Sequence, residues 1–125
     1  MFILDTNHLS ILQRKNVSQE ILAAKLERVS SEEVATTIVC LEEEFRGWMA
    51  YLASLRSVDT HVGAYMRLHR LLEIFTNLSV LPFDEKSLSV FQGLWLHRIK
   101  VSTLTLKIAS ISIANDATLL TQTTA

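Results

Sequence analysis

Short apolar runs of strand character alternate with longer segments of helical periodicity along this chain of 125 residues. Runs rich in β-branched residues predict strands, whereas apolar residues spaced three or four apart predict amphipathic helices. The predicted strands cover residues 2–5, 34–39, 78–83 and 117–121. This alternation predicts an α/β fold.

The segments between these runs carry helical stripes. Helices are predicted over about 41–55 and 61–75, and two helices in succession form a helical hairpin. Their stripes are Leu41, Phe45, Trp48, Leu52 and Leu55 in the first and Val62, Tyr65, Leu68, Leu72 and Phe75 in the second. Further helices are expected around Leu9, from Ser18, and from an Asp84 cap through Trp95.

The segment 101–114 has apolar residues with a period nearer two than 3.6, so a strand is also defensible there. We favour a mostly buried helix, because Asn115 and Asp116 supply a turn and 117–121 supplies a better last strand.

Composition bounds the class of protein. The chain fits a single domain over 1–125, and 49% hydrophobic and 20% charged residues exclude a disordered class. A net charge of -1 offers no global basic field, so any contact with RNA must be local. No apolar segment is long enough to span a membrane, and a lone Cys40 in an apolar setting fits a reducing compartment. We expect a cytoplasmic protein.

Carboxylates occur at two places that suit a site. Asp5 follows the first predicted strand, where open α/β sheets place their ligands, although an aspartate there can equally cap a helix. Glu42, Glu43 and Glu44 open the predicted helix 41–55, where acidic residues also form an ordinary solvated face favoured by the helix dipole. Glu43 lies opposite the apolar stripe, an orientation that fits either solvent or an acidic cleft.

Three segments taken together resemble the PIN domain, and more narrowly the toxin nucleases of VapC type. They are Leu4-Asp5-Thr6-Asn7, the run from Glu43 to Trp48, and the closing stretch from Leu106 to Thr121. The resemblance covers the whole chain and implies a three-layer α/β/α domain with a central parallel sheet. It also implies an acidic pocket for Mg²⁺ or Mn²⁺, cleavage of RNA and an antitoxin protein as partner.

The resemblance assigns Asp5 and Glu43 as metal ligands and Asn7 as a polar residue that orients the site. Glu42 is the fallback if the register shifts by one residue. The family's next acid falls at Thr105, and its last acid would follow Thr121, where the sequence ends as Gln-Thr-Thr-Ala, shorter than the family pattern. With two of four carboxylates present, we expect impaired ribonuclease activity. Asp84 and Asp116 are interpreted as a cap and a turn residue rather than as replacements.

Two other interpretations remain open. One is a catalytically silent PIN-like protein that still binds an antitoxin-like partner or RNA; the other is a helical interaction domain in which Asp5 is only a cap. Trp48, Tyr65 and Trp95 lie at helical spacing among aliphatic residues, which favours core or homodimer-interface positions over base stacking. We expect a homodimer.

Overall fold

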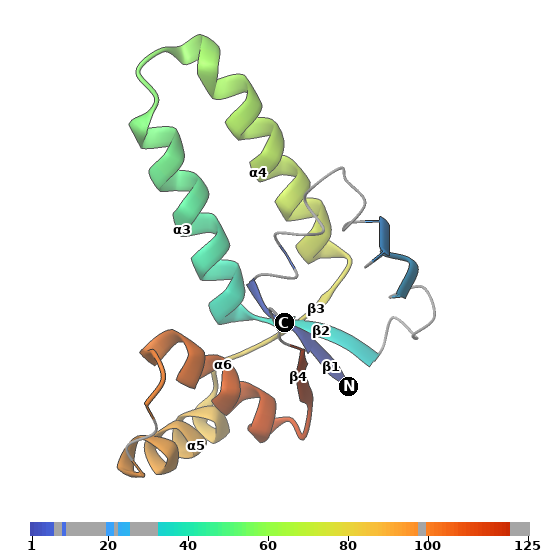
Figure 1. Ribbon diagram of the computed structural model, residues 1–125, viewed down its shortest axis with the longest axis vertical. Helices are drawn as coiled ribbons and strands as arrows, with labels where there is room; N and C mark the ends of the chain where they lie inside the picture. Colours follow the sequence, from blue (N-terminus) through green and yellow to red (C-terminus); the bar gives the residue numbers. More distant parts are fainter. Residues whose placement is uncertain (7–8, 10–19, 22, 26–32, 98–99, 121–125) are drawn as a thin grey trace.

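A parallel sheet forms the centre of the molecule in the computed structural model, which describes residues 1–6, 9, 20–21, 23–25, 33–97 and 100–120 (Figure 1). Within these residues the strands are β1 (Phe2–Leu4), β2 (Val34–Thr37), β3 (Ser79–Leu81) and β4 (Thr118–Leu120). Their order is β3-β2-β1-β4, and each neighbouring pair is parallel. The predicted strand positions are confirmed, with shorter bounds.

The strand order places β1 at a topological switch point. The chain proceeds from β1 to β2 and β3 on one side, and then returns to the other side of β1 as β4. Helices α3 and α4 lie on one side of the strands, whereas α5 and α6 lie on the other (Figure 1). The three-layer α/β/α fold with a central parallel sheet is therefore confirmed, and the alternative of a purely helical domain is not.

Helix α3 (Ile38–Ser54) begins three residues before the predicted start. The Thr37 hydroxyl accepts a hydrogen bond from the Cys40 backbone N–H at 3.1 Å, which caps the helix. Strand β2 consequently ends at Thr37 rather than at residue 39. Glu42, Glu43 and Glu44 therefore lie beyond the first turn, and the prediction that they open the helix is wrong.

Helix α4 (His61–Thr76) follows α3 through a short 3₁₀ turn, η2 (Val58–Thr60), and forms the expected hairpin. The α3 stripe is confirmed, since its members are partly buried. The α4 stripe is wrong in part: Val62, Tyr65 and Leu72 are exposed, and the buried face carries Ala64, Leu71 and Phe75. Apolar residues occur on several sides of α4, so periodicity alone could not select the buried face. The contact between the Phe45 and Phe75 rings, with centroids 6.4 Å apart, joins the buried face of α4 to α3.

Helices α5 (Glu85–Leu96) and α6 (Thr103–Ala114) pack against each other. Asp84 caps α5 as expected, and α6 confirms the helical interpretation of 101–114. Its ambiguous pattern has a physical cause, because α6 is buried on more than one side. Ser110 and Ser112 lie inside and donate their hydroxyl hydrogen bonds to the carbonyls of Leu106 and Ile108.

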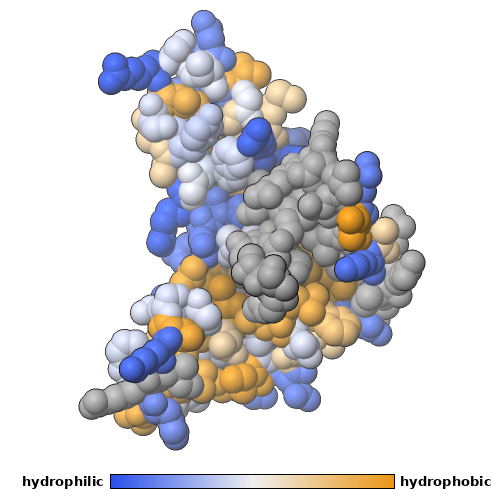
Figure 2. Space-filling model, viewed as in Figure 1, coloured by the Kyte–Doolittle hydropathy of each residue, from blue (hydrophilic) through white to orange (hydrophobic). Residues whose placement is uncertain are grey.

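The hydrophobic core joins the sheet to the helices on both sides. Its buried members include Ile3, Leu4, Val34, Cys40 and Ile111, and the free thiol of Cys40 is buried as predicted. In Figure 2, hydrophobic residues gather over the region of the sheet, α5 and α6. Among the described residues, no helix is long and apolar enough to cross a membrane. The helices predicted before residue 34 fall largely outside the described residues.

Candidate functional site

Asp5 follows β1 directly and is half-buried. Its carbonyl oxygen accepts a hydrogen bond from the Leu9 backbone N–H at 3.1 Å, so a helical turn begins at Asp5 and Thr6 is the first residue of that turn. Ligands of open α/β sheets bind outside the carboxyl ends of the strands at such a switch point. The backbone of Asp5 thus caps a helical turn. The residue itself lies at the carboxyl end of β1, where a site is expected.

Two buried side chains, one in β2 and one in the first turn of α3, contact the end of β1. The Thr36 hydroxyl donates a hydrogen bond to the Leu4 carbonyl at 3.0 Å, and the Cys40 thiol contacts the same oxygen at 3.9 Å. Both groups reach the same carbonyl, so the end of β2 and the first turn of α3 lie beside the residue that precedes Asp5. The next turn of α3 therefore begins close to this edge of the sheet.

Glu43 is the side chain on that adjacent turn. The Thr6 hydroxyl donates a hydrogen bond to Oε2 of Glu43 at 2.9 Å, and both residues are partly buried. Thr6 is bonded to Asp5 in the chain, and consecutive Cα atoms are about 3.8 Å apart. The second predicted acid therefore lies beside the residue that neighbours the first. Sequence reasoning missed Thr6, which it named only as part of the segment Leu4-Asp5-Thr6-Asn7, although a hydroxyl next to Asp5 was the available signal.

The neighbouring glutamates have different surroundings. Glu42 is exposed and pairs with Arg46, one turn later in α3, at 2.8 Å. Glu44 is buried, with 8% of its surface exposed. Of the three glutamates, only Glu42 therefore lies on a solvated face. The contact with Thr6 favours Glu43 over Glu42 as the second acid of the expected site.

Thr105, where the resemblance expects an acid, is exposed in the first turn of α6. Ser102 caps this helix, because its Oγ accepts the Thr105 backbone N–H at 3.1 Å. The same Ser102 hydroxyl donates to Oγ1 of Thr105 at 2.8 Å. Thr105 thus contributes to the capped start of α6. This helix contacts α3, the helix that carries Glu43. Asn7 and the residues after Leu120 lie outside the described residues.

The donor set of the described residues is small. They contain no group of three or more His, Cys, Asp and Glu side chains placed to hold a metal ion. Mg²⁺ keeps several waters and is commonly held by one or two carboxylates together with substrate phosphates. The pair Asp5 and Glu43 suits such a weakly held, hard cation.

Asp84 and Asp116 take the structural positions predicted for them. The Ser87 backbone N–H and hydroxyl donate to Oδ1 of Asp84 at 3.0 and 2.9 Å, and these hydrogen bonds lower the pKa of Asp84 below its ordinary value. Asp116 adopts a left-handed backbone with φ of 51° in the turn after α6. The interpretation of the two residues as a cap and a turn residue is therefore confirmed.

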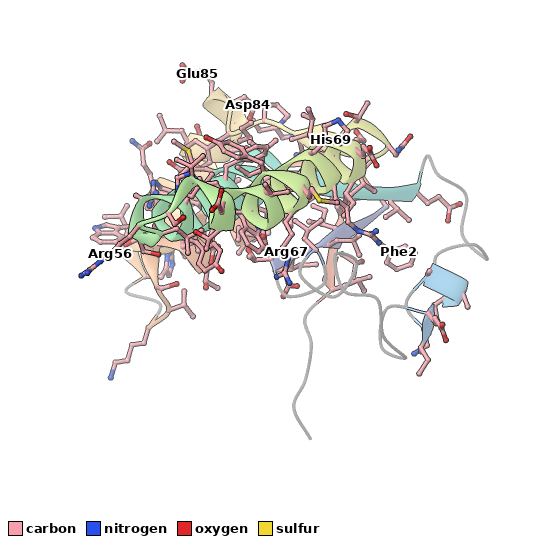
Figure 3. The ribbon with its side chains drawn as sticks, turned by 90° about the horizontal axis from the view of Figure 1, so that it is seen from above. Phe2, Arg56, Arg67, His69, Asp84 and Glu85 are labelled. Atoms are coloured by element: carbon pink, nitrogen blue, oxygen red, sulfur yellow. The ribbon has the colours of Figure 1, made fainter. Side chains whose placement is uncertain are left out.

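The aromatic residues expected in a core or an interface differ in exposure. Trp48 is partly buried against the core, with the Arg67 guanidinium 5.3 Å from the centre of its ring. Arg67 and His69 project from opposite sides of α4 (Figure 3). Tyr65 is 59% exposed and Trp95 is 60% exposed, so a core position is wrong for both.

Solved structures with the same fold are found, although no protein-family model and no curated protein sequence matches the chain. FitAcB from Neisseria gonorrhoeae matches with 23% identity and a TM-score of 0.71 over 99% of this chain and 88% of that one. VapBC2 from Rickettsia felis, bound to a DNA fragment from its promoter, matches with 19% identity and a TM-score of 0.72 over 98% and 86%. DNA-bound VapBC from Salmonella typhimurium matches with 16% identity and a TM-score of 0.68 over 93% and 81%. At these identities, the matches show that the chain shares its fold with these structures.

Proposed function

We propose that the chain is a VapC-like, metal-dependent endoribonuclease of impaired activity, acting as the toxin of a toxin–antitoxin pair. Asp5 and Glu43 bind Mg²⁺ or Mn²⁺, and Asn7 helps to orient the site. Thr105 occupies the position of an absent acid.

The contact between Thr6 and Glu43 carries the proposal. It brings the second acid, 37 residues after Thr6, to the end of β1 where Asp5 lies. An acid used only as a cap or a solvated helix residue needs no such convergence. The switch point in the sheet and the similar fold of the VapBC2 and FitAcB structures support the same edge as the site.

A divalent cation at this pair supplies positive charge for a phosphate group and lowers the pKa of a bound water. The residues of the chain do the rest. Asp5 and Glu43 contribute carboxylate oxygens, the hydrogen bond from Thr36 joins β2 to the end of β1, and the hydrogen bond from Thr6 restricts where Glu43 can move. Two carboxylates hold a cation less tightly than four, which is the reason for impaired activity.

A catalytically silent PIN-like protein is the second candidate. The observation that favours it is the pairing of Thr105 with Ser102, because a residue committed to a helix cap adds no charge to the pocket. Such a protein would still bind an antitoxin-like partner or RNA.

We propose an antitoxin-like protein as partner, since the similar structures carry the names of two-component VapBC and FitAB complexes. We also propose a homodimer, in which the exposed Trp95 of α5 is buried between the two copies. The free, buried Cys40 fits a reducing cytoplasm.

RNA cleavage in the presence and absence of Mg²⁺ or Mn²⁺ tests the proposal. Asp5→Asn and Glu43→Gln are the test variants, and Glu42→Gln is the matched control because it removes the same charge from the next position of α3. We expect weak, metal-dependent cleavage that disappears in both test variants and persists in the control. Equal cleavage in all three variants would refute the assigned site; no cleavage and no Mn²⁺ binding in the natural chain would favour the silent protein.

A further inference from the structure

We infer that Thr6 is the positioning residue for Glu43, so that the hydroxyl next to the first acid sets the orientation of the second. This inference rests on the proposed function for its use of the metal, but the orientation itself is a property of the folded chain. The observation is the hydrogen bond of 2.9 Å from Thr6 Oγ1 to Glu43 Oε2, at a partly buried place between two elements distant in sequence.

The two oxygens of the Glu43 carboxylate are thereby made different. Oε2 accepts the Thr6 hydroxyl, and among the described residues no hydrogen bond or ion pair reaches Oε1. A glutamate has three rotatable side-chain bonds, and fixing one oxygen removes most of its freedom. Oε1 is then the oxygen presented to a cation, while Oε2 is held.

The donor is itself held firmly. Thr6 is the first residue of the turn that begins at Asp5, and its branched side chain restricts χ1. The acceptor lies on α3, whose start is placed by two contacts with the Leu4 carbonyl, from Thr36 at the end of β2 and from Cys40 in the first turn of α3. The hydrogen bond of 2.9 Å between these two segments is therefore part of the folded structure and does not require a bound metal to form.

A polar residue behind a metal ligand affects metal binding without touching the metal. Partners of this kind orient the ligand, and their removal typically lowers metal affinity by roughly 10- to 100-fold. In a site with two carboxylates, the orientation of each has more influence on metal binding, because the described residues contain no group of three or more possible ligands. Thr6 thus acts through Glu43.

Two variants separate the hydroxyl from the shape of the side chain. Thr6→Val removes the donor and keeps the branched volume, whereas Thr6→Ser keeps the donor. We expect Mn²⁺ alone, titrated into the full chain and followed by calorimetry, to bind roughly tenfold more weakly to Thr6→Val and with nearly natural affinity to Thr6→Ser. The natural affinity in Thr6→Val would overturn the inference while leaving the proposed function intact.

A double-mutant cycle provides a readout that needs neither metal nor RNA. Thr6→Val and Glu43→Ala are combined, and unfolding in urea without metal is measured for each variant. We expect the loss from Thr6→Val to shrink in the Glu43→Ala background, because its partner is already absent. Additive losses would overturn the inference. If the natural chain binds no Mn²⁺, the proposed function fails on its own, and this cycle alone decides whether Thr6 orients Glu43.

Discussion

The hydroxyls of Ser102 and Thr105 lie 2.8 Å apart at the start of α6, and Ser102 also accepts the backbone N–H of Thr105. Thr105 is therefore the third residue of the helix counted from its cap, the position at which helices favour an acid. The resemblance therefore expects a carboxylate at a position where a carboxylate is also favourable for the start of α6.

Thr105→Asp should accordingly be tolerated by the fold. A carboxylate in the first turn interacts favourably with the helix dipole, by typically about 0.3–1 kcal/mol, so unfolding in urea should show equal or slightly greater stability. The added charge should also strengthen Mn²⁺ binding and raise RNA cleavage. Thr105→Asn is the control, because it is similar in shape and carries no charge. A loss of stability together with unchanged Mn²⁺ binding would contradict this prediction.

The orientation of α4 can be tested with two adjacent leucines. Leu71 is fully buried, whereas Leu72 is 55% exposed. Leu71→Ala should lower the free energy of unfolding by about 2–5 kcal/mol through lost burial and the cavity left behind. Leu72→Ala should change it by only about 0.5 kcal/mol. Chemical denaturation of both variants measures the effect. Equal losses of unfolding free energy would show that α4 does not bury the face that carries Leu71.

Asp84 should contribute to the acid sensitivity of α5. Its pKa in the folded chain is lowered by the hydrogen bonds from the Ser87 backbone and side chain, so its contribution is present above the unfolded pKa of about 3.9 and is lost as the pH falls through the folded value. Asp84→Asn keeps a capping side chain without a charge. We expect this variant to lose less stability than the natural chain between pH 5 and pH 2–3, measured by urea unfolding; identical pH profiles would argue against a role for the charge.

The proposed homodimer can be tested at α5. Trp95 stacks on Phe91, with ring centres 5.9 Å apart, and stays largely exposed in the single chain. Trp95→Glu removes a large aromatic side chain from the proposed interface and places a charge there. We expect this variant to dimerise at least roughly tenfold more weakly. Sedimentation equilibrium measures the effect. Tyr65→Glu, on the exposed face of α4, is the matched control and should leave the dimer unchanged; the reverse result would move the interface to α4.

The positions that sequence reasoning described correctly are those with a local signature. Asp5 follows a recognisable strand, and the caps at Asp84 and the turn at Asp116 are set by side chains that act within a few residues. The contact of Thr6 with Glu43 joins residues 37 apart and leaves no periodic pattern, so it could not be found in that way. The assignment of Asp5, Asn7 and Glu43 as site residues remains a prediction.

The sequence by itself determined the alternation of strands and helices, the capped start of α5 and the acid at the end of β1. These follow from local preferences, which depend on the spacing of apolar residues and on short-range hydrogen bonds. Only the tertiary structure decided which face of α4 is buried, how α6 could be apolar on several sides, and that Thr6 holds Glu43. Those outcomes depend on which elements meet across the sheet, and packing between distant segments is not encoded in the period of either one.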